Sequence, residues 1–265
     1  MTLNFVRIAY AYDRTRYHPP EVSGKIATAI VAPVEEAFRE PAFLELGVGT
    51  GRVGVPIVAR GYRFVGVDVN PSMLEVMRYK IAGVGRKVKL LEADARSLPF
   101  ERGSFHAVIG VHFWHLVEDW QRALLEAFRV LVPGGFLFEG WDTTTAASED
   151  WRIQEKWREI LNELGFQLER GRHQRRLAEV RQAMERIGLE PEEITVAEWV
   201  EDRSPRQSLE ILGERLYSFT QKVPEDVFHA SLERLWEWAR DTYPDLDQSY
   251  PIPWSFVMRR TRLPG

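Results

Sequence analysis

The chain has no cysteine, no long apolar run and little net charge, and each of these absences excludes a class of function. Without cysteine, the protein cannot form disulfides, thiolate metal sites or a cysteine nucleophile. No apolar run reaches the ~18–20 residues of a membrane-spanning helix, and the first residues lack a secretory signal pattern. A net charge of −4 gives no electrostatic reason to expect nucleic acid as the main partner. We therefore expect a globular cytoplasmic protein that acts on a small molecule, and we leave its oligomeric state open.

A strand that ends in a glycine-rich turn is the most informative pattern in the sequence. Residues 43–51 read FLELGVGTG, so a loop of nearly bare backbone directly follows an apolar strand. The helix expected over about 53–60 directs its free N–H groups toward this loop. A nucleotide-type ligand is therefore expected at this corner. The loop glycines are Gly47, Gly49 and Gly51.

The same glycines satisfy two different fingerprints. With Glu45 in front of them they form G-x-G-x-G, the pattern of S-adenosylmethionine (SAM) methyltransferases. With Gly54 at the end they form G-x-G-x-x-G, the dinucleotide pattern, for which Asp68 lies at about the expected distance. The loop alone leaves both ligands open.

Strands and helices alternate through the first half of the chain, which predicts a largely parallel sheet covered on both faces. The expected strands are 42–46, 62–68, 87–92, 105–111 and 136–141, the last after a turn at 133–135. The expected helices there are 20–38, 53–60, 71–81 and 119–131. In the second half we expect helices at 148–165, 174–187, 205–217 and 224–243, and strands at 193–202 and 255–262. We assign residues 1–145 to a core with an N-terminal helix, and 146–265 to helical cap insertions plus the last two strands.

Two carboxylates at strand ends are candidates for nucleoside recognition. Asp68 ends the second strand and can accept hydrogen bonds from both ribose hydroxyls, although an aspartate before a helix is also a common N-cap. Asp94 follows the third strand and can accept from the exocyclic amine of adenine, with the small Ala95 leaving room for the ring. The alternative for Asp94 is a solvated loop residue. Only the second pair separates the two cofactors, in favour of SAM.

Five segments in register extend this pattern and resemble the class I SAM-dependent methyltransferases, in the small-molecule branch that includes the ubiquinone and menaquinone C-methyltransferases. The segments are LELGVGTGR at 44–52, VGVDVN at 65–70, EADARSLPF at 92–100, SFHAVIGVHFWHLV at 104–117 and RVLVPGGFLF at 129–138. The resemblance covers roughly residues 40–141. It implies a seven-stranded Rossmann-like sheet with a last antiparallel strand, helices on both faces, and a helical cap inserted in the C-terminal half.

The resemblance also implies how SAM is held and S-adenosylhomocysteine is released. Glu45 and the loop at 47–51 would hold the methionine end, Asp68 the ribose, and Asp94 with Ala95 the adenine edge. Tyr17, in an aromatic leader, would fold over the cofactor, or else only pack. The remaining cofactor residues implied in this way are Val48, Arg52, Val69, Met73 and Val111.

His112 and His115 follow the fourth strand, where the methyl group should emerge. Either could act as a general base, and the alternative for both is a structural role in the loop. No cluster of Asp and His has metal-ligand spacing, so we expect no metal. We predict methyl transfer from SAM to a small organic acceptor through an oxygen, carbon or nitrogen nucleophile, with catalysis mainly by positioning. The alternatives are an NAD(P)-dependent oxidoreductase and a SAM-binding protein without turnover.

Overall fold

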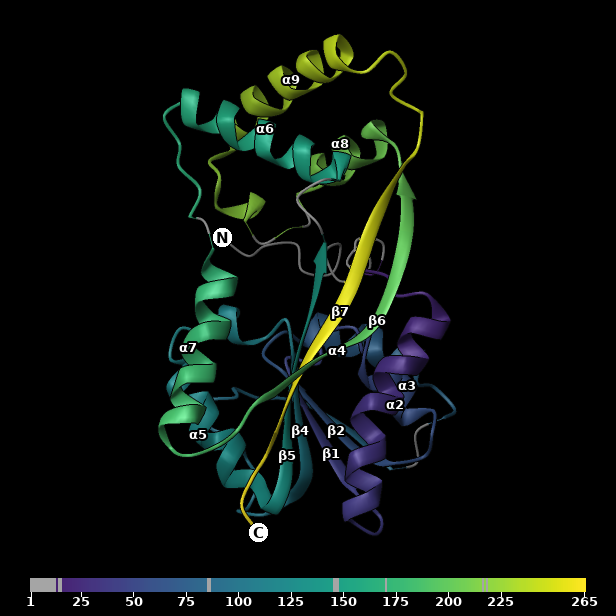
Figure 1. The fold of residues 1–265 in the computed structure, drawn as a ribbon, viewed down its shortest axis with the longest axis vertical. Helices are drawn as coiled ribbons and strands as arrows, with labels where there is room; N and C mark the ends of the chain where they lie inside the picture. The colour runs from purple at the N-terminus through teal and green to yellow at the C-terminus, as the bar shows by residue number, and fades with distance from the viewer. Residues whose placement is uncertain are drawn as a thin grey trace. The chain divides into compact units, whose positions relative to one another are not determined.

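A computed structural model describes residues 13, 16–84, 87–144, 148–169, 171–215, 217 and 219–265. Seven strands form one sheet in the order β3-β2-β1-β4-β5-β7-β6 (Figure 1). The strands are β1 (Ala42–Leu46), β2 (Arg63–Asp68), β3 (Val88–Glu92), β4 (Phe105–Val111), β5 (Leu131–Thr144), β6 (Glu192–Arg203) and β7 (Tyr250–Arg262).

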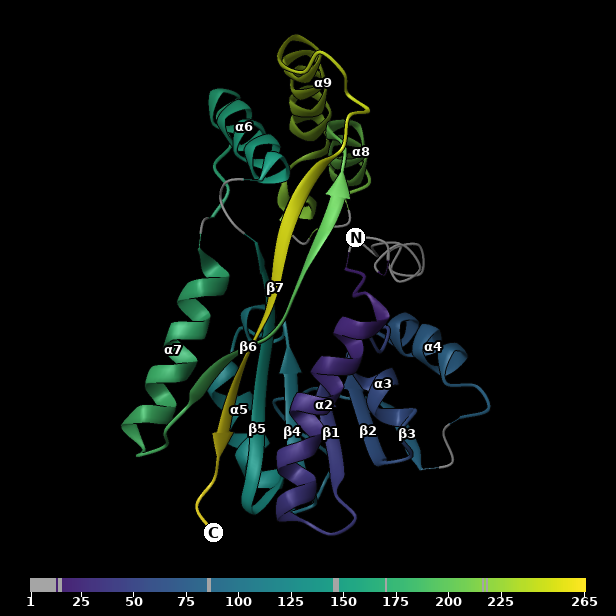
Figure 2. The ribbon, with the colours of Figure 1, turned by 45° about the vertical axis from the view of Figure 1, so that its right-hand side comes forward.

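The first five strands are parallel, and the sheet reverses its winding between β1 and β4. β1 pairs with β2 on one side and with β4 on the other, and Glu45 lies opposite Gly66 and Ile109. β7 runs in the opposite direction to β5 and β6, between which it lies (Figure 2). Ligands of open parallel sheets bind beyond the carboxyl ends of the strands at such a reversal. The predicted fold class is confirmed.

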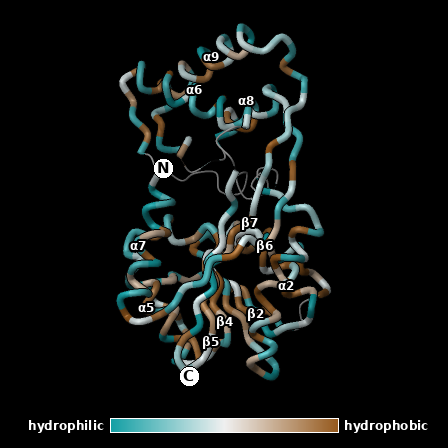
Figure 3. The backbone as a smooth tube through the Cα atoms, viewed as in Figure 1, coloured by the Kyte–Doolittle hydropathy of each residue, from teal (hydrophilic) through white to brown (hydrophobic). Residues whose placement is uncertain are grey.

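Helices cover both faces of this sheet. One face packs on α5 (Trp120–Val130) and α7 (Arg172–Arg186) through a core that includes Leu44, Val108, Ala127 and Met184. The other face is covered by α2 (Pro20–Ala37) and α3 (Gly54–Val58), which lie together on the opposite side in both ribbon views. α4 (Pro71–Lys80) packs on β2 and β3. Figure 3 shows the hydrophobic residues gathered in these strands, as expected for a sheet buried on both faces.

Two helix starts near the site are set by short polar side chains. The Asn70 side chain accepts a hydrogen bond from the Ser72 amide, and Pro71 occupies the first position of α4. The Asp119 side chain accepts from the Arg122 amide at the start of α5. These caps fix where the loops after β2 and β4 end.

β5 is longer than the sequence indicates. We expected a turn at 133–135 and a strand over 136–141, but the strand spans Leu131–Thr144 with an irregular register between the pairs Phe105–Leu131 and Ala107–Phe136. The glycines therefore form a bulge within the strand, where Gly134 has a φ of +72°. The extension past 141 brings Asp142 into the strand.

The chain divides into two compact units. The first contains Met1–Asp142, Gly171–Ala197 and Phe256–Gly265; the second contains Thr143–Arg170 and Glu198–Ser255. In the second unit, α6 (Glu149–Glu163), α8 (Pro205–Gly213) and α9 (Glu225–Thr242) share a core around Trp157 and Phe228. The boundary predicted after residue 145, and the cap role of the part beyond it, stay predictions. No helix in the described ranges is long and apolar enough to cross a membrane.

Candidate functional site

A cavity of about 450 Å³ lies in the first unit at the carboxyl ends of the parallel strands. This volume is in the range of small-molecule and cofactor sites. Its walls come from the glycine loop after β1, the end of β2, the start of α4, and the loops after β3 and β4. The predicted residues that line it are Gly47, Gly49, Asp68, Val69, Met73, Asp94, Ala95, Val111 and His112.

The glycine loop has the backbone conformation that its composition predicts. Gly47 and Gly49 have φ angles of +62° and +54°, in the left-handed region that favours glycine. A Cβ atom on Gly47 would lie 2.7 Å from the ring of Phe113, so this glycine also lets the loop after β4 approach. The Val48 amide bonds to the Val67 carbonyl at 3.0 Å, which ties the loop to β2.

Asp68 is held by backbone amides on both of its carboxylate oxygens. The Gly49 amide donates to Oδ2 and the Asn70 amide to Oδ1, each at 2.9 Å. Burial raises the pKa of Asp68, while these amides act in the opposite direction. Because Asn70 caps α4, the N-cap interpretation of Asp68 does not apply. Each carboxylate oxygen has a second lone pair, so the group can still accept hydrogen bonds from a ligand in the cavity.

Glu45 lies beneath the loop and does not line the cavity. It is 3% exposed, and its Oε2 has no hydrogen-bond partner among the described residues. Burial raises its pKa to about 8; Arg52 lowers it and Asp68 raises it further. A Cβ on Gly54 would lie 2.7 Å from this oxygen and 2.6 Å from Phe64, so the glycine permits α3 to pack closely.

Asp94 has a partner that sequence reasoning missed. The Arg96 side chain donates to both of its oxygens at 2.6–3.0 Å, and the Arg96 amide donates at 2.8 Å. Arg96 lowers the pKa of Asp94, which is therefore ionised. Ala95 is buried at 6% exposure. Asp94 borders the cavity, so it can accept a ligand hydrogen bond only while it also binds Arg96.

The other predicted residues do not line the cavity. Tyr17 is 64% exposed, Val48 is buried against Gly66, and Gly51 packs on Met77 and Val55. Arg52 and His115 make polar contacts described next.

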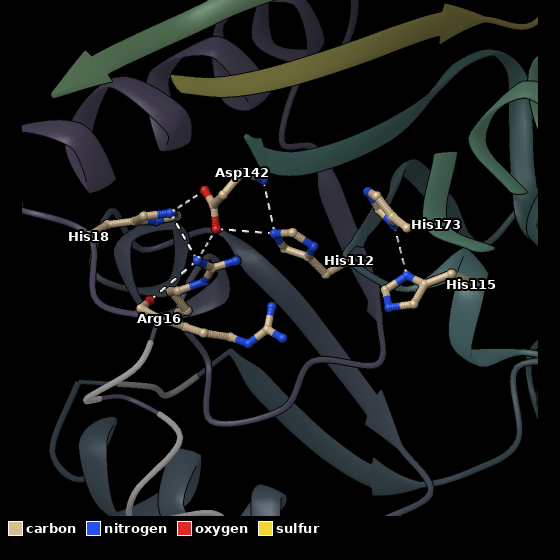
Figure 4. Close-up of polar contacts among 7 residues, drawn as sticks. Arg16, His18, His112, His115, Asp142 and His173 are labelled. Atoms are coloured by element: carbon tan, nitrogen blue, oxygen red, sulfur yellow. Dashed lines mark hydrogen bonds and ion pairs between the residues drawn. The ribbon is translucent and has the colours of Figure 1, made fainter. Parts of the chain in front are cut away.

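Asp142, at the end of β5, joins four separate segments (Figure 4). Its carboxylate contacts His18 Nε2 at 2.7 Å, Arg52 Nη1 at 2.5 Å and His112 Nε2 at 3.1 Å. Arg52 Nη1 also donates to the Arg16 carbonyl at 3.2 Å. Burial by itself raises the pKa of Asp142, but Arg52, His112 and His18 together hold it well below its usual value. A buried carboxylate with these partners stays ionised.

His112 stands at the junction of this network and the cavity. Its φ of +49° is unusual for a residue other than glycine. Nε2 faces both the Asp142 carboxylate, at 3.1 Å, and the Asp142 amide, at 2.9 Å. Burial lowers the pKa of His112 to about 4, against the opposing effect of Asp142. The ring is therefore neutral at physiological pH.

Two more histidines pack beside His112. His115, in a short 3-10 helix (Trp114–Leu116), and His173, in the first turn of α7, place their Nδ1 atoms 3.0 Å apart. The His173 ring stacks on that of His112 with centroids 5.6 Å apart. Burial lowers the pKa of His115 to about 3 and also lowers that of His173; the positive charge of Arg16 acts in the same direction on both.

Sequence reasoning missed Asp142, His18 and His173. Asp142 carries the signal used for Asp68, a carboxylate at a strand end, but the expected strand stopped one residue earlier. His173 and His18 gave no such signal because they lie 58 and 124 residues from the groups they contact. Within the described ranges, no cluster of His, Asp and Glu has the arrangement of a metal site.

Known proteins share this fold and sequence. A family of methyltransferase domains matches residues 44–138. An uncharacterized methyltransferase of Mycobacterium tuberculosis is 31% identical over 263 residues, which cover 97% of this chain and 93% of that protein. The demethylmenaquinone methyltransferase of Thermus thermophilus is 42% identical over 96 residues, 36% of this chain and 44% of that enzyme.

Solved structures agree on the fold. The YcgJ protein of Bacillus subtilis has a TM-score of 0.55 at 21% identity, covering 89% of this chain and 98% of that one. A methyltransferase-like protein of Bacillus halodurans has a TM-score of 0.52 at 17% identity, covering 89% and 100%. With the sheet order, the glycine loop and the full-length relative together, the chain belongs to the class I SAM-dependent methyltransferases.

Proposed function

We propose that the cavity at the ends of β1–β4 holds SAM and that the protein transfers its methyl group to a small organic molecule. The observation that carries this proposal is the Asp68 carboxylate, which is fixed by two backbone amides and borders the cavity with lone pairs to spare. Such a group fits a ribose diol, because it can accept from both hydroxyls.

The strand order gives the orientation of the ligand. Asp94 and Ala95 lie beyond β3, on one side of Asp68, so adenine belongs there, with Val69 and Met73 beside it. The glycine loop and Glu45 lie beyond β1 and would receive the methionine end. β4 is the next strand in the sheet, so the methyl group would point toward Val111 and His112.

SAM supplies an activated methyl group on a sulfonium, so the chain need not supply a nucleophile. The remaining work is to orient the acceptor and to exclude water, which can contribute up to ~7–11 kcal/mol. Buried aromatic residues near the β4 end, Phe113 and Trp114 among them, fit this requirement. The acceptor would be a small molecule with an oxygen, carbon or nitrogen nucleophile, and the cytoplasmic location and the absence of nucleic-acid partners stay predictions.

Gly54 had left a dinucleotide ligand open. In the structure it gives close packing of α3 on Phe64 and Glu45, a role that either cofactor class requires. It therefore favours neither, and the comparisons support the methyltransferase.

Two measurements test the proposal. Calorimetric titration with SAM and, separately, with NADH should show binding of SAM only. Incubation with methyl-labelled SAM and a small-molecule cell extract should then place label in a product below about one kilodalton. Binding of NADH without SAM would refute the cofactor, and SAM binding with no labelled product would refute the transfer.

A further inference from the structure

The loop after β4 and the end of β5 bring together a histidine and a carboxylate that neither the fold nor the cofactor requires. His112 lines the cavity, and it is the cavity residue whose ring contacts Asp142. Asp142 is 11% exposed and His112 14% at the side chain, so their contact is shielded from water. The positive φ of His112 turns the side chain toward β5 at an energetic cost, which the network must offset.

The two contacts of His112 Nε2 require opposite protonation states. If Nε2 carries the proton, it donates to the Asp142 carboxylate at 3.1 Å and leaves the lone pair on Nδ1. If Nε2 is bare, it accepts from the Asp142 amide at 2.9 Å and Nδ1 carries the proton. The carboxylate is ionised, and a charge-assisted bond is roughly twice as strong as a neutral one. The first state is therefore favoured, with Nδ1 free to act as a base.

Resting on the proposed function, we propose that His112 Nδ1 takes the proton of the methyl acceptor and that Asp142 positions His112 by holding its Nε2–H. The acceptor atom is accordingly an oxygen or an acidic carbon that bears a proton. As the bond from this atom to the methyl carbon forms, the methyl–sulfur bond breaks and its electron pair goes to sulfur. The acceptor proton passes to Nδ1, and Asp142 stabilises the imidazolium that results.

The charges around His112 favour such an acceptor over an amine. Arg16 and Arg52 both lower the pKa of His112 through their positive charge, and the carboxylate of Asp142 is already engaged by Arg52 and His18. A cationic ammonium would be repelled here, whereas a hydroxyl or carbon acid that gains negative charge as it loses its proton would be stabilised. The charged and titratable groups around the ring are Asp142 from β5, Arg16 and His18 from the N-terminal segment, Arg52 from the loop before α3, His115, and His173 from α7.

The tautomer of His112 tests the positioning role without a known acceptor. The full chain with ¹⁵N-labelled histidine has six imidazoles, which single substitutions assign in NMR spectra at pH 7 with S-adenosylhomocysteine bound. We expect His112 to be neutral with its proton on Nε2. In Asp142→Asn the backbone amide still faces Nε2 while the charge is gone, so the proton should move to Nδ1. A wild-type proton on Nδ1, or no change in Asp142→Asn, would overturn the proposal.

Label transfer tests the base. With methyl-labelled SAM and a small-molecule extract, His112→Gln should lower the rate about a hundredfold or more, and Asp142→Asn by at least about tenfold. His229→Gln removes an exposed histidine of α9 and should transfer like wild type. Circular dichroism confirms folding of each variant. Transfer by wild type that His112→Gln retains would refute the base; absence of transfer by wild type would instead refute the proposed function and leave the tautomer result standing.

Discussion

Binding of SAM should release a proton from Glu45. With a pKa of about 8, this carboxyl is ~90% protonated at pH 7 in the free protein. Its Oε2 is buried without a partner, so nothing in the described structure compensates a negative charge at that atom. A ligand ammonium about 4 Å away would contribute roughly 4 kcal/mol at an effective dielectric constant near 20. That corresponds to about three pKa units, enough to ionise Glu45 at pH 7.

The expected release is therefore ~0.9 proton for each SAM bound at pH 7. Isothermal titration calorimetry in buffers of different ionisation enthalpy measures it, because the slope of the observed enthalpy against that enthalpy is the number of protons exchanged. The α-amino group of SAM also titrates near this pH. We therefore compare wild type with Glu45→Gln, in which that contribution cancels.

A second ligand sharpens the control. 5′-Methylthioadenosine has the nucleoside but lacks the cationic amino-acid end, so it should bind wild type without releasing the proton. If wild type and Glu45→Gln give the same slope with SAM, the ammonium does not reach Glu45, and the position we propose for the methionine end is wrong.

Three further changes test the described geometry. Asp68→Asn should weaken SAM binding about ten- to hundredfold in calorimetry, since each charge-assisted bond contributes ~1.5–3 kcal/mol and an amide group would face the Gly49 or Asn70 N–H; an unchanged Kd would count against the ribose role. Gly54→Ala should lower the free energy of unfolding by about 1–3 kcal/mol in urea titrations, because its Cβ would meet Phe64 at 2.6 Å; full stability would show that α3 can shift. The pKa of His115 in the folded protein lies below its unfolded value, so stability that it permits at pH 7 is lost as the pH falls. The stability advantage of wild type over His115→Gln should shrink by about 2 kcal/mol between pH 7 and pH 5, and a constant difference would mean that His115 is not buried in its neutral form.

The core of the fold could be predicted because its signals are local. The apolar segments, the Asn70-Pro71 helix start and the glycine loop each involve residues within a few positions of one another. The predicted strand 42–46 and strand 105–111 coincide with β1 and β4. The end of β5 could not be predicted in this way, because its continuation past the bulge depends on pairing with β4 and on β7 lying beside it.

The candidate site divides along the same line. Asp68 was recognised because a carboxylate directly follows an apolar strand, and the cavity does form beside it. Its backbone amide partners and the competition of Arg96 for Asp94 depend on loop conformations that no sequence pattern specifies. The roles assigned to these residues stay predictions, and the structure adds the contacts on which their tests depend.

The parallel sheet explains why ionisable groups meet here at all. Five neighbouring strands end at one edge, and each presents a group there or in the loop that follows: Glu45, Asp68, Asp94, His112 and Asp142. The β2–β3 side carries carboxylates that can accept from a nucleoside, while the β4–β5 side carries an imidazole held by a carboxylate that Arg52 neutralises. Arg52 follows the glycine loop, so it connects the two sides through one side chain. A ligand that moves this loop would also shift Asp142, and with it the tautomer of His112, which couples the cofactor end of the site to the acceptor end.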